Sequence, residues 1–241
     1  MTRAALSTLA IDCGNTRLKW GLFRDGAWRR TGAVLLGARA QLDAEWSHLE
    51  SPDRIVVSNV AGDAIGRRLA GLLSRWQSAP LWVQSKRSQC GVTNSYDEPE
   101  RLGTDRWAAL IGAWSLQPGP SLVVNAGTAT TADILAGDGN FAGGIIFPGV
   151  GLMQRSLAQN AAGLFLASGR FDKQPRNTAD AIETGCLLAQ AGAIERLYSE
   201  TEPGSTCFIS GGDAPRVASA LRVAARQVEN LVLEGLLRMA E

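Results

Sequence analysis

The sequence predicts an α/β fold built from two duplicated halves, each with the element order βββαβαβα. Two apolar segments end in nearly the same glycine loop, and aligning Gly14 with Gly127 also aligns Asp12 with Asn125. Each loop is followed by a hairpin signal and then by alternating helical and strand patterns. At 241 residues the chain is long enough for two halves of about 120 residues that each bury a core.

The first half, predicted as residues 1–118, opens with strands at 8–12, 17–23 and 27–34. Residues 17–23 alternate apolar and polar side chains, which is the period of a half-buried strand. Asp25-Gly26 is a tight hairpin signal between the second and third strands. The later elements are expected as a helix at 39–49, a strand at 54–60, a helix at 64–76, a strand at 81–84 and a helix at 105–116.

The second half, predicted as residues 119–241, repeats this order. A strand at 121–125 leads into the second glycine loop, and Gly137-Asp138-Gly139 joins two strands of a hairpin. No low-complexity linker separates the halves, so we expect them to pack with a cleft between them. The expected elements are strands at 121–125, 130–135, 141–147 and 207–210 and helices at 150–160, 178–199, 214–221 and 229–239.

The paired glycine loops point to a phosphotransferase. Glycine has no Cβ, so backbone N–H groups in such a loop approach phosphate oxygens closely. The residue at the end of each strand, Asp12 or Asn125, is placed to reach a metal ion or a water. Duplicated halves of this kind around a nucleotide cleft are the architecture of the actin, hexokinase and Hsp70 group, an analogy that concerns the fold alone.

Composition excludes several other classes. The net charge of +1 gives no reason to expect a nucleic acid or membrane partner, and no apolar run is long enough for a membrane span. The four cysteines are scattered without CxxC spacing, which indicates reduced thiols in a cytoplasmic protein and argues against a zinc site. The single histidine, His48, lies in a predicted surface helix, so any proton transfer falls to a carboxylate.

A third constellation, Gly103-Thr104-Asp105-Arg106, stands at the start of a predicted helix. One interpretation is that Thr104 or Asp105 caps this helix. The other is that Asp105 accepts a proton from a substrate hydroxyl, while Arg106 and the helix N-terminus favour an anionic substrate group. The residues alone leave both open.

Five motifs in order resemble type III pantothenate kinase, over a stretch from the first strand to the C-terminal helix. They are Asp12-Cys-Gly-Asn-Thr-Arg-Leu-Lys19, Gly103-Thr-Asp-Arg106, Ala126-Gly-Thr-Ala-Thr130, Gly143-Gly-Ile-Ile-Phe-Pro-Gly149 and Asn177-Thr178. The resemblance implies an actin-like homodimer that phosphorylates pantothenate from ATP, the first step toward coenzyme A. It also implies Mg²⁺ with ATP and a monovalent cation, potassium or ammonium.

The resemblance assigns the first loop to the ATP phosphates, with Asp12 acting mainly through magnesium or its waters. Asn15, Thr16 and Lys19 are the phosphate donors, and Thr128 is the matching contact on the second loop. The residues of the first loop that the resemblance assigns to ATP binding are Asp12, Cys13, Gly14, Asn15, Thr16, Arg17, Leu18 and Lys19.

The pantothenate pocket is implied to contain Tyr96, Gly103, Thr104, Asp105 and Arg106, with Asp105 as the proton acceptor. Thr178 is implied to touch pantothenate too, from the partner subunit. Plainer interpretations exist for three residues outside the helix start: Lys19 as a solvated strand residue, Tyr96 as a packing aromatic and Thr178 as a helix cap.

Asn125 departs from the family, which has aspartate at this position for the monovalent cation. Asparagine keeps a carbonyl oxygen and loses the charge, so we expect weaker cation affinity or a changed requirement. Two other functions stay open on the sequence: a nucleotide-binding regulator of the accessory transcription factor kind, and a sugar or acetate kinase. Retention of Asp105, Arg106, Asp12 and Lys19 favours the enzyme over the regulator.

Overall fold

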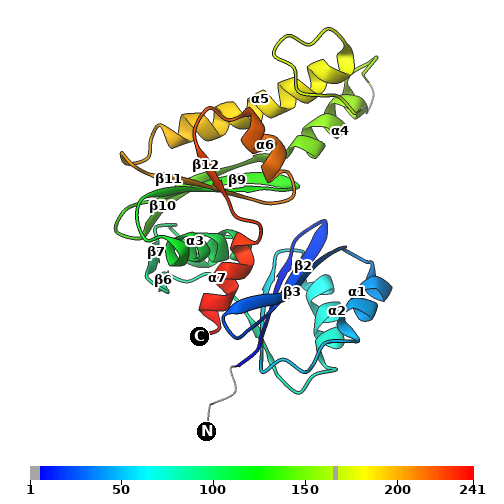
Figure 1. The fold of residues 1–241 in the computed structure, drawn as a ribbon, viewed down its shortest axis with the longest axis vertical. Coiled ribbons are helices and arrows are strands. Elements are labelled where there is room, and N and C mark those ends of the chain that lie inside the picture. Colours follow the sequence, from blue (N-terminus) through cyan, green and yellow to red (C-terminus); the bar gives the residue numbers. More distant parts are fainter. Residues whose placement is uncertain (1–5, 165–167) are drawn as a thin grey trace. The chain divides into compact units, whose positions relative to one another are not determined.

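The structure, a computed structural model, describes residues 6–164 and 168–241. It divides into two units, one of Met1–Gln117 with Leu231–Glu241 and one of Pro118–Asn230 (Figure 1). The sequence predicts halves at 1–118 and 119–241. The units differ from these halves by one element, because the C-terminal helix α7 (Leu231–Met239) belongs to the first unit.

The sheet of the first unit has the strand order β3-β2-β1-β4-β5. β1, β2 and β3 form an antiparallel meander, whereas β4 and β5 run parallel to β1. Asp25 and Gly26 form the predicted two-residue turn, and both have positive φ, 51° and 74°. The strands are β1 (Thr8–Cys13), β2 (Arg17–Arg24), β3 (Ala27–Leu35), β4 (Arg54–Asn59) and β5 (Pro80–Trp82).

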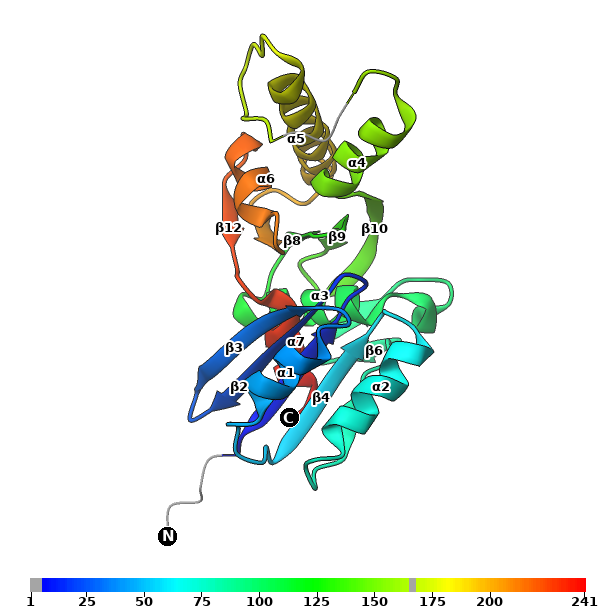
Figure 2. The ribbon, with the colours of Figure 1, turned by 90° about the vertical axis from the view of Figure 1, so that its right-hand side faces the viewer.

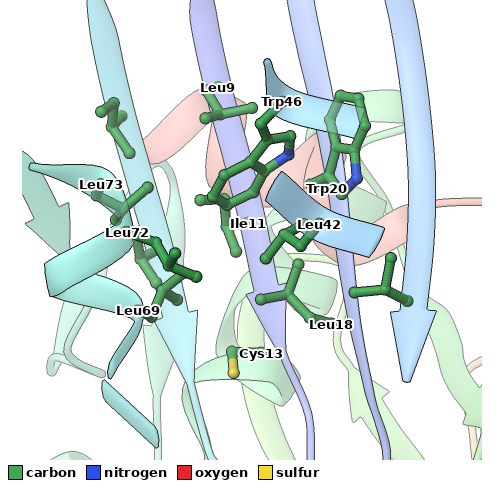
Figure 3. Close-up of a cluster of buried hydrophobic side chains, with 13 residues drawn as sticks. Leu9, Ile11, Cys13, Leu18, Trp20, Leu42, Trp46, Leu69, Leu72 and Leu73 are labelled. Atoms are coloured by element: carbon green, nitrogen blue, oxygen red, sulfur yellow. The ribbon is translucent and has the colours of Figure 1, made fainter. Parts of the chain in front are cut away.

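Helices α1 (Arg39–Trp46) and α2 (Asp63–Leu73) cover one face of this sheet (Figures 2 and 3). Their apolar side chains pack on alternate residues of β1, β2 and β4. Trp46 of α1 is buried edge-on against Trp20 of β2, with ring centroids 6.2 Å apart. The Trp20 indole N–H donates to Glu45, so the burial of its polar atom is compensated.

On the opposite face lie α3 (Thr104–Leu116) and α7, whose backbones touch. A Cβ on Gly235 of α7 would lie 1.8 Å from the Ala108 carbonyl oxygen of α3. A Cβ on Gly112 of α3 would lie 2.4 Å from the Leu231 carbonyl oxygen. Glycines at the crossing therefore let the two helices approach more closely than any side chain permits, which fixes α7 in the first unit.

The second unit repeats the first, with strand order β12-β11-β8-β9-β10. This is the order β5-β4-β1-β2-β3 with each strand replaced by its counterpart, so the predicted duplicated α/β fold is confirmed. Its helices α4, α5 and α6 supply the apolar cover for β8, β9 and β11. The elements are β8 (Ser121–Ala126), β9 (Ala129–Leu135), β10 (Asn140–Pro148), α4 (Val150–Asn160), α5 (Thr178–Tyr198), β11 (Thr206–Ser210), α6 (Ala214–Ala220) and β12 (Ala225–Gln227).

Several predicted boundaries are wrong for local reasons. The helix predicted to reach residue 76 ends at Leu73, where the Ser74 hydroxyl donates to the Gly71 carbonyl and the Trp76 N–H donates to the Leu73 carbonyl. The end of α1 is similar, since the hydroxyl of its C-cap residue Ser47 donates to the Ala44 carbonyl. The short strands β6 (Ser88–Gln89), β7 (Val92–Asn94) and β12 are too brief to show a period of two. Of the helices in residues 6–164 and 168–241, none combines the length and apolar character that crossing a bilayer requires.

Candidate active site

The first glycine loop leaves the end of β1 and closes on itself. The Gly14 N–H donates to the Arg17 carbonyl at 3.1 Å, and the Leu36 N–H donates to the Thr16 carbonyl at 2.8 Å. Asn15, Thr16 and Arg17 are exposed at the tip, whereas Lys19 is half-buried on β2. The loop therefore presents polar side chains and backbone groups at the carboxyl end of β1, as the sequence predicts.

The second loop has the same construction and is one residue shorter. The Gly127 N–H donates to the Ala129 carbonyl at 3.1 Å, and β9 begins two residues after Gly127 rather than three. Thr128 is exposed at its tip. A Cβ on Gly149 would lie 2.0 Å from the Gly127 carbonyl oxygen, so a glycine before α4 supports this loop from behind. Asn125 is half-buried at the end of β8, directly opposite Thr131 of β9.

Asp12, near the end of β1, has one carboxylate oxygen without a hydrogen-bond partner. Its Oδ1 is buried, and none of the described residues provides it with a hydrogen-bond partner. Burial, together with the charge of Asp105, raises the pKa of Asp12 to about 7, against the lowering effect of Lys19, which lies opposite it across the strands. A buried anionic oxygen without a donor is a position that a cation or its water shell would satisfy.

Asp105 is brought next to Asp12 by the sheet and by one hydroxyl pair. Asp12 is the register partner of Ser58 on the parallel strand β4. The Ser58 hydroxyl lies 2.8 Å from the Thr104 hydroxyl, and Thr104 directly precedes Asp105 in the first turn of α3. Burial raises the pKa of Asp105, whereas the N–H and the charge of Arg106 lower it. The two carboxylates predicted from distant motifs thus belong to one site.

Neither Thr104 nor Asp105 is the N-cap residue of α3, but the Asp105 carboxylate satisfies one free N–H of the first turn. Gly103 is the N-cap residue, and no side chain makes a capping hydrogen bond there. Thr104 bonds to Ser58, and Asp105 Oδ1 accepts from the N–H of the next residue, Arg106, at 2.8 Å. A Cβ on Gly103 would lie 2.7 Å from that same Oδ1, so glycine leaves room for the carboxylate.

Arg106 and Tyr96 form one unit beside Asp105. The buried Arg106 guanidinium donates to the Tyr96 hydroxyl at 2.8 Å and lies over its ring, 5.7 Å from the centroid. The Tyr96 backbone N–H donates to the side chain of the buried Asn94, whose amide donates in turn to the Pro99 carbonyl. Tyr96 is therefore more than a packing aromatic, because its hydroxyl partners the buried arginine.

Thr178 is the first residue of α5 in the second unit, and it is exposed. The cap of this helix is Asn177, whose side chain accepts from the Asp180 N–H at 2.9 Å. The helix-cap interpretation of Thr178 is therefore wrong, and its side chain lies at the surface.

Sequence reasoning missed three buried polar groups. Ser58 and Ser85 hold the start of α3, the latter by donating to the Leu102 carbonyl at 2.8 Å. Serines at strand ends are common, so nothing in the sequence marks these two. In the second unit Glu183 is buried and pairs with Arg216, beside a polar cavity of about 600 Å³. Its spacing from Arg216 carries no sequence signal either.

The chain is similar to named proteins over almost its whole length. A family model described as type III pantothenate kinase matches residues 8–200. A type III pantothenate kinase from Aromatoleum aromaticum is 50% identical, over 95% of this chain and 95% of that protein. One from Dechloromonas aromatica is 48% identical, over 96% of this chain and 98% of that protein.

Solved structures share the fold at low sequence identity. A Campylobacter jejuni protein assigned to the Baf family of transcriptional activators has a TM-score of 0.63 at 20% identity, covering 96% of both chains. MreB 5 of Spiroplasma citri, solved with AMPPNP, has a TM-score of 0.51 at 10% identity, covering 95% of this chain and 94% of that one. At these identities the likeness concerns the fold alone.

Proposed function

We propose that the chain phosphorylates pantothenate with ATP. The chain belongs to the type III pantothenate kinase family, and its first unit has two neighbouring carboxylates, Asp12 and Asp105, that suit this reaction. The observation that carries the proposal is the pair Asp12 and Asp105, joined through Ser58 and Thr104 at the carboxyl ends of β1 and β4. Phosphoryl transfer needs positioning, charge neutralisation and an oriented nucleophile, and this site supports all three.

Asp105 is the proposed proton acceptor for the substrate hydroxyl. Its raised pKa makes it a stronger base than an exposed carboxylate, and the Arg106 N–H fixes one of its oxygens. The other residues of the predicted pocket, Tyr96, Gly103 and Thr104, lie around it in the first unit. The Arg106 guanidinium and the N-terminus of α3 favour the carboxylate that pantothenate carries.

Asp12 fits Mg²⁺, which would arrive with ATP, because its Oδ1 is buried without a donor. The bound ion would neutralise phosphate charge. Asn15, Thr16 and Lys19 are proposed to donate to phosphate oxygens from the first loop, and Thr128 from the second. A monovalent cation is proposed at Asn125 with weakened affinity, since its side chain offers a neutral oxygen.

A homodimer is proposed, with Thr178 contacting pantothenate bound to the partner subunit. Support comes from large apolar side chains that the second unit leaves exposed and that contact with a second copy would bury. They are Ile145, Ile146, Leu152, Leu157 and Leu188. Sedimentation at micromolar protein tests the assembly, and a fully active monomer would contradict it.

The alternative of a regulator without kinase activity is not favoured. The likeness to the Baf-family structure concerns the fold alone, and a pure binding module needs no proton acceptor at Asp105.

The experiment is a coupled ADP-release assay of the purified protein, with pantothenate compared against a panel of sugars and acetate. ADP release that depends on pantothenate supports the proposal. Release with a sugar or acetate, and none with pantothenate, would overturn it.

A further inference from the structure

We infer that Ser58 is a positioning residue for phosphoryl transfer: its hydroxyl holds the first turn of α3, and with it the Asp105 carboxylate, against the strand end that carries Asp12. This inference rests on the proposed function. Ser58 occupies the next-to-last position of β4 and is completely buried. Its hydroxyl bonds to the Thr104 hydroxyl, so its effect would be exerted through Thr104.

The hydroxyl pair joins two parts of the first unit that are distant in sequence. Ser58 and Thr104 are 46 residues apart, and their oxygens lie 2.8 Å from each other. On the strand side, Ser58 is in register with Asp12 of β1. On the helix side, Thr104 is the residue before Asp105. The hydroxyl pair therefore links the backbone segments that carry the two carboxylates.

The start of α3 receives no capping bond from its N-cap residue, so side-chain contacts made by its first turn hold it in place. Gly103 is the N-cap residue and has no side chain to bond the free N–H groups of the first turn. A second buried serine, Ser85, holds the preceding segment through the Leu102 carbonyl. Loss of the Ser58 hydroxyl would leave the Thr104 hydroxyl without this partner and free the first turn to shift.

A purely structural role predicts a different outcome, and Ser7 provides the matched control. Ser7 is also a buried serine of this sheet, but it precedes β1 at the opposite end from Asp12. Its hydroxyl donates to Asp53 at 2.7 Å. Ser58→Ala removes one hydroxyl bond and Ser7→Ala removes two, and only Ser58→Ala removes a bond at the site.

The test measures kcat and the KM for ATP of the parent, Ser58→Ala and Ser7→Ala, together with their melting temperatures. We expect Ser58→Ala to lower kcat by about tenfold, with KM for ATP changed by less than about twofold. Ser7→Ala should lower the melting temperature and leave kcat within about twofold of the parent. Activity of the parent with pantothenate tests the proposed function separately.

Two Thr104 variants test the link from the helix side, should Ser58→Ala fail to fold. Thr104→Val should lower kcat by about tenfold, and Thr104→Ser, which keeps the hydroxyl, should lower it by less than Thr104→Val does. In the double variant Ser58→Ala/Thr104→Val the two losses of kcat should not multiply, because each substitution removes the same interaction. A kcat near the parent's in Ser58→Ala, equal losses in Ser58→Ala and Ser7→Ala, or multiplying losses in the double variant would overturn the inference.

Discussion

Gly103→Ala is expected to damage catalysis while leaving the fold intact. The backbone of Gly103, at φ −54° and ψ 133°, is open to any L-residue, so alanine meets no backbone strain. The new Cβ would instead lie 2.7 Å from Asp105 Oδ1, and ordinary contact begins at 3.4 Å. The carboxylate must therefore move by most of an ångström. Because it is the end of a side chain, this movement costs little free energy.

A displacement of this size at a reacting group lowers kcat by roughly 10- to 100-fold. The free energy of unfolding should change by less than about 1 kcal/mol, because the entropic gain of alanine opposes the poorer N-cap. Steady-state kinetics with pantothenate and a denaturant titration measure the two quantities on the same preparation.

The matched control is Gly71→Ala. Gly71 lies inside α2, where a Cβ would meet no atom within 4 Å. Alanine there should stabilise the protein by up to about 1 kcal/mol through helix propensity, with kcat unchanged. A Gly103→Ala enzyme with the parent's kcat would refute the reasoning that the position of Asp105 limits the reaction.

Three further predictions concern the core, the cation and pH. Gly235→Ala should destabilise the protein by about 3 kcal/mol or more in denaturant titration, because the new Cβ would overlap the Ala108 carbonyl; a parent-like midpoint would rule out the close helix crossing. Asn125→Asp should strengthen the response of activity to potassium chloride, titrated against a bulky organic cation at constant ionic strength; superimposable curves would remove Asn125 from the cation site. Asp12 has a pKa raised from 3.8 to about 7, so folding binds a proton and stability falls as pH rises through that window. Asp12→Asn should therefore raise the melting temperature near about pH 8 and change it little near about pH 4, and an equal shift at both would contradict the burial of this charge.

Predictions that rest on short, local sequence patterns agree with the structure. Asp25-Gly26 forms its two-residue turn because the side-chain and backbone preferences of these residues suffice to choose it. The strand-loop pattern around Gly14 and Gly127 predicts the duplication, because an apolar strand and the glycine after it can be recognised within a few consecutive residues. The five motifs likewise carry the family, which residues 8–200 confirm.

What the sequence does not show depends on contacts between distant segments. The place of α7 is decided by the meeting of Gly235 with Ala108, which no periodicity reveals. The hydroxyl bond that holds the start of α3 joins Ser58 to Thr104, which is 46 residues away in the sequence. The roles of the individual site residues stay predictions.

The most direct measurement is the formation of phosphopantothenate by purified parent protein and by Asp105→Asn, followed by mass spectrometry with ATP and pantothenate. The parent should form the product, and Asp105→Asn should form it more slowly by on the order of 100-fold or more, with ATP binding nearly unaffected. No product from the parent would contradict the proposed reaction, and an Asp105→Asn rate within a few-fold of the parent's would contradict the role of Asp105 as its base.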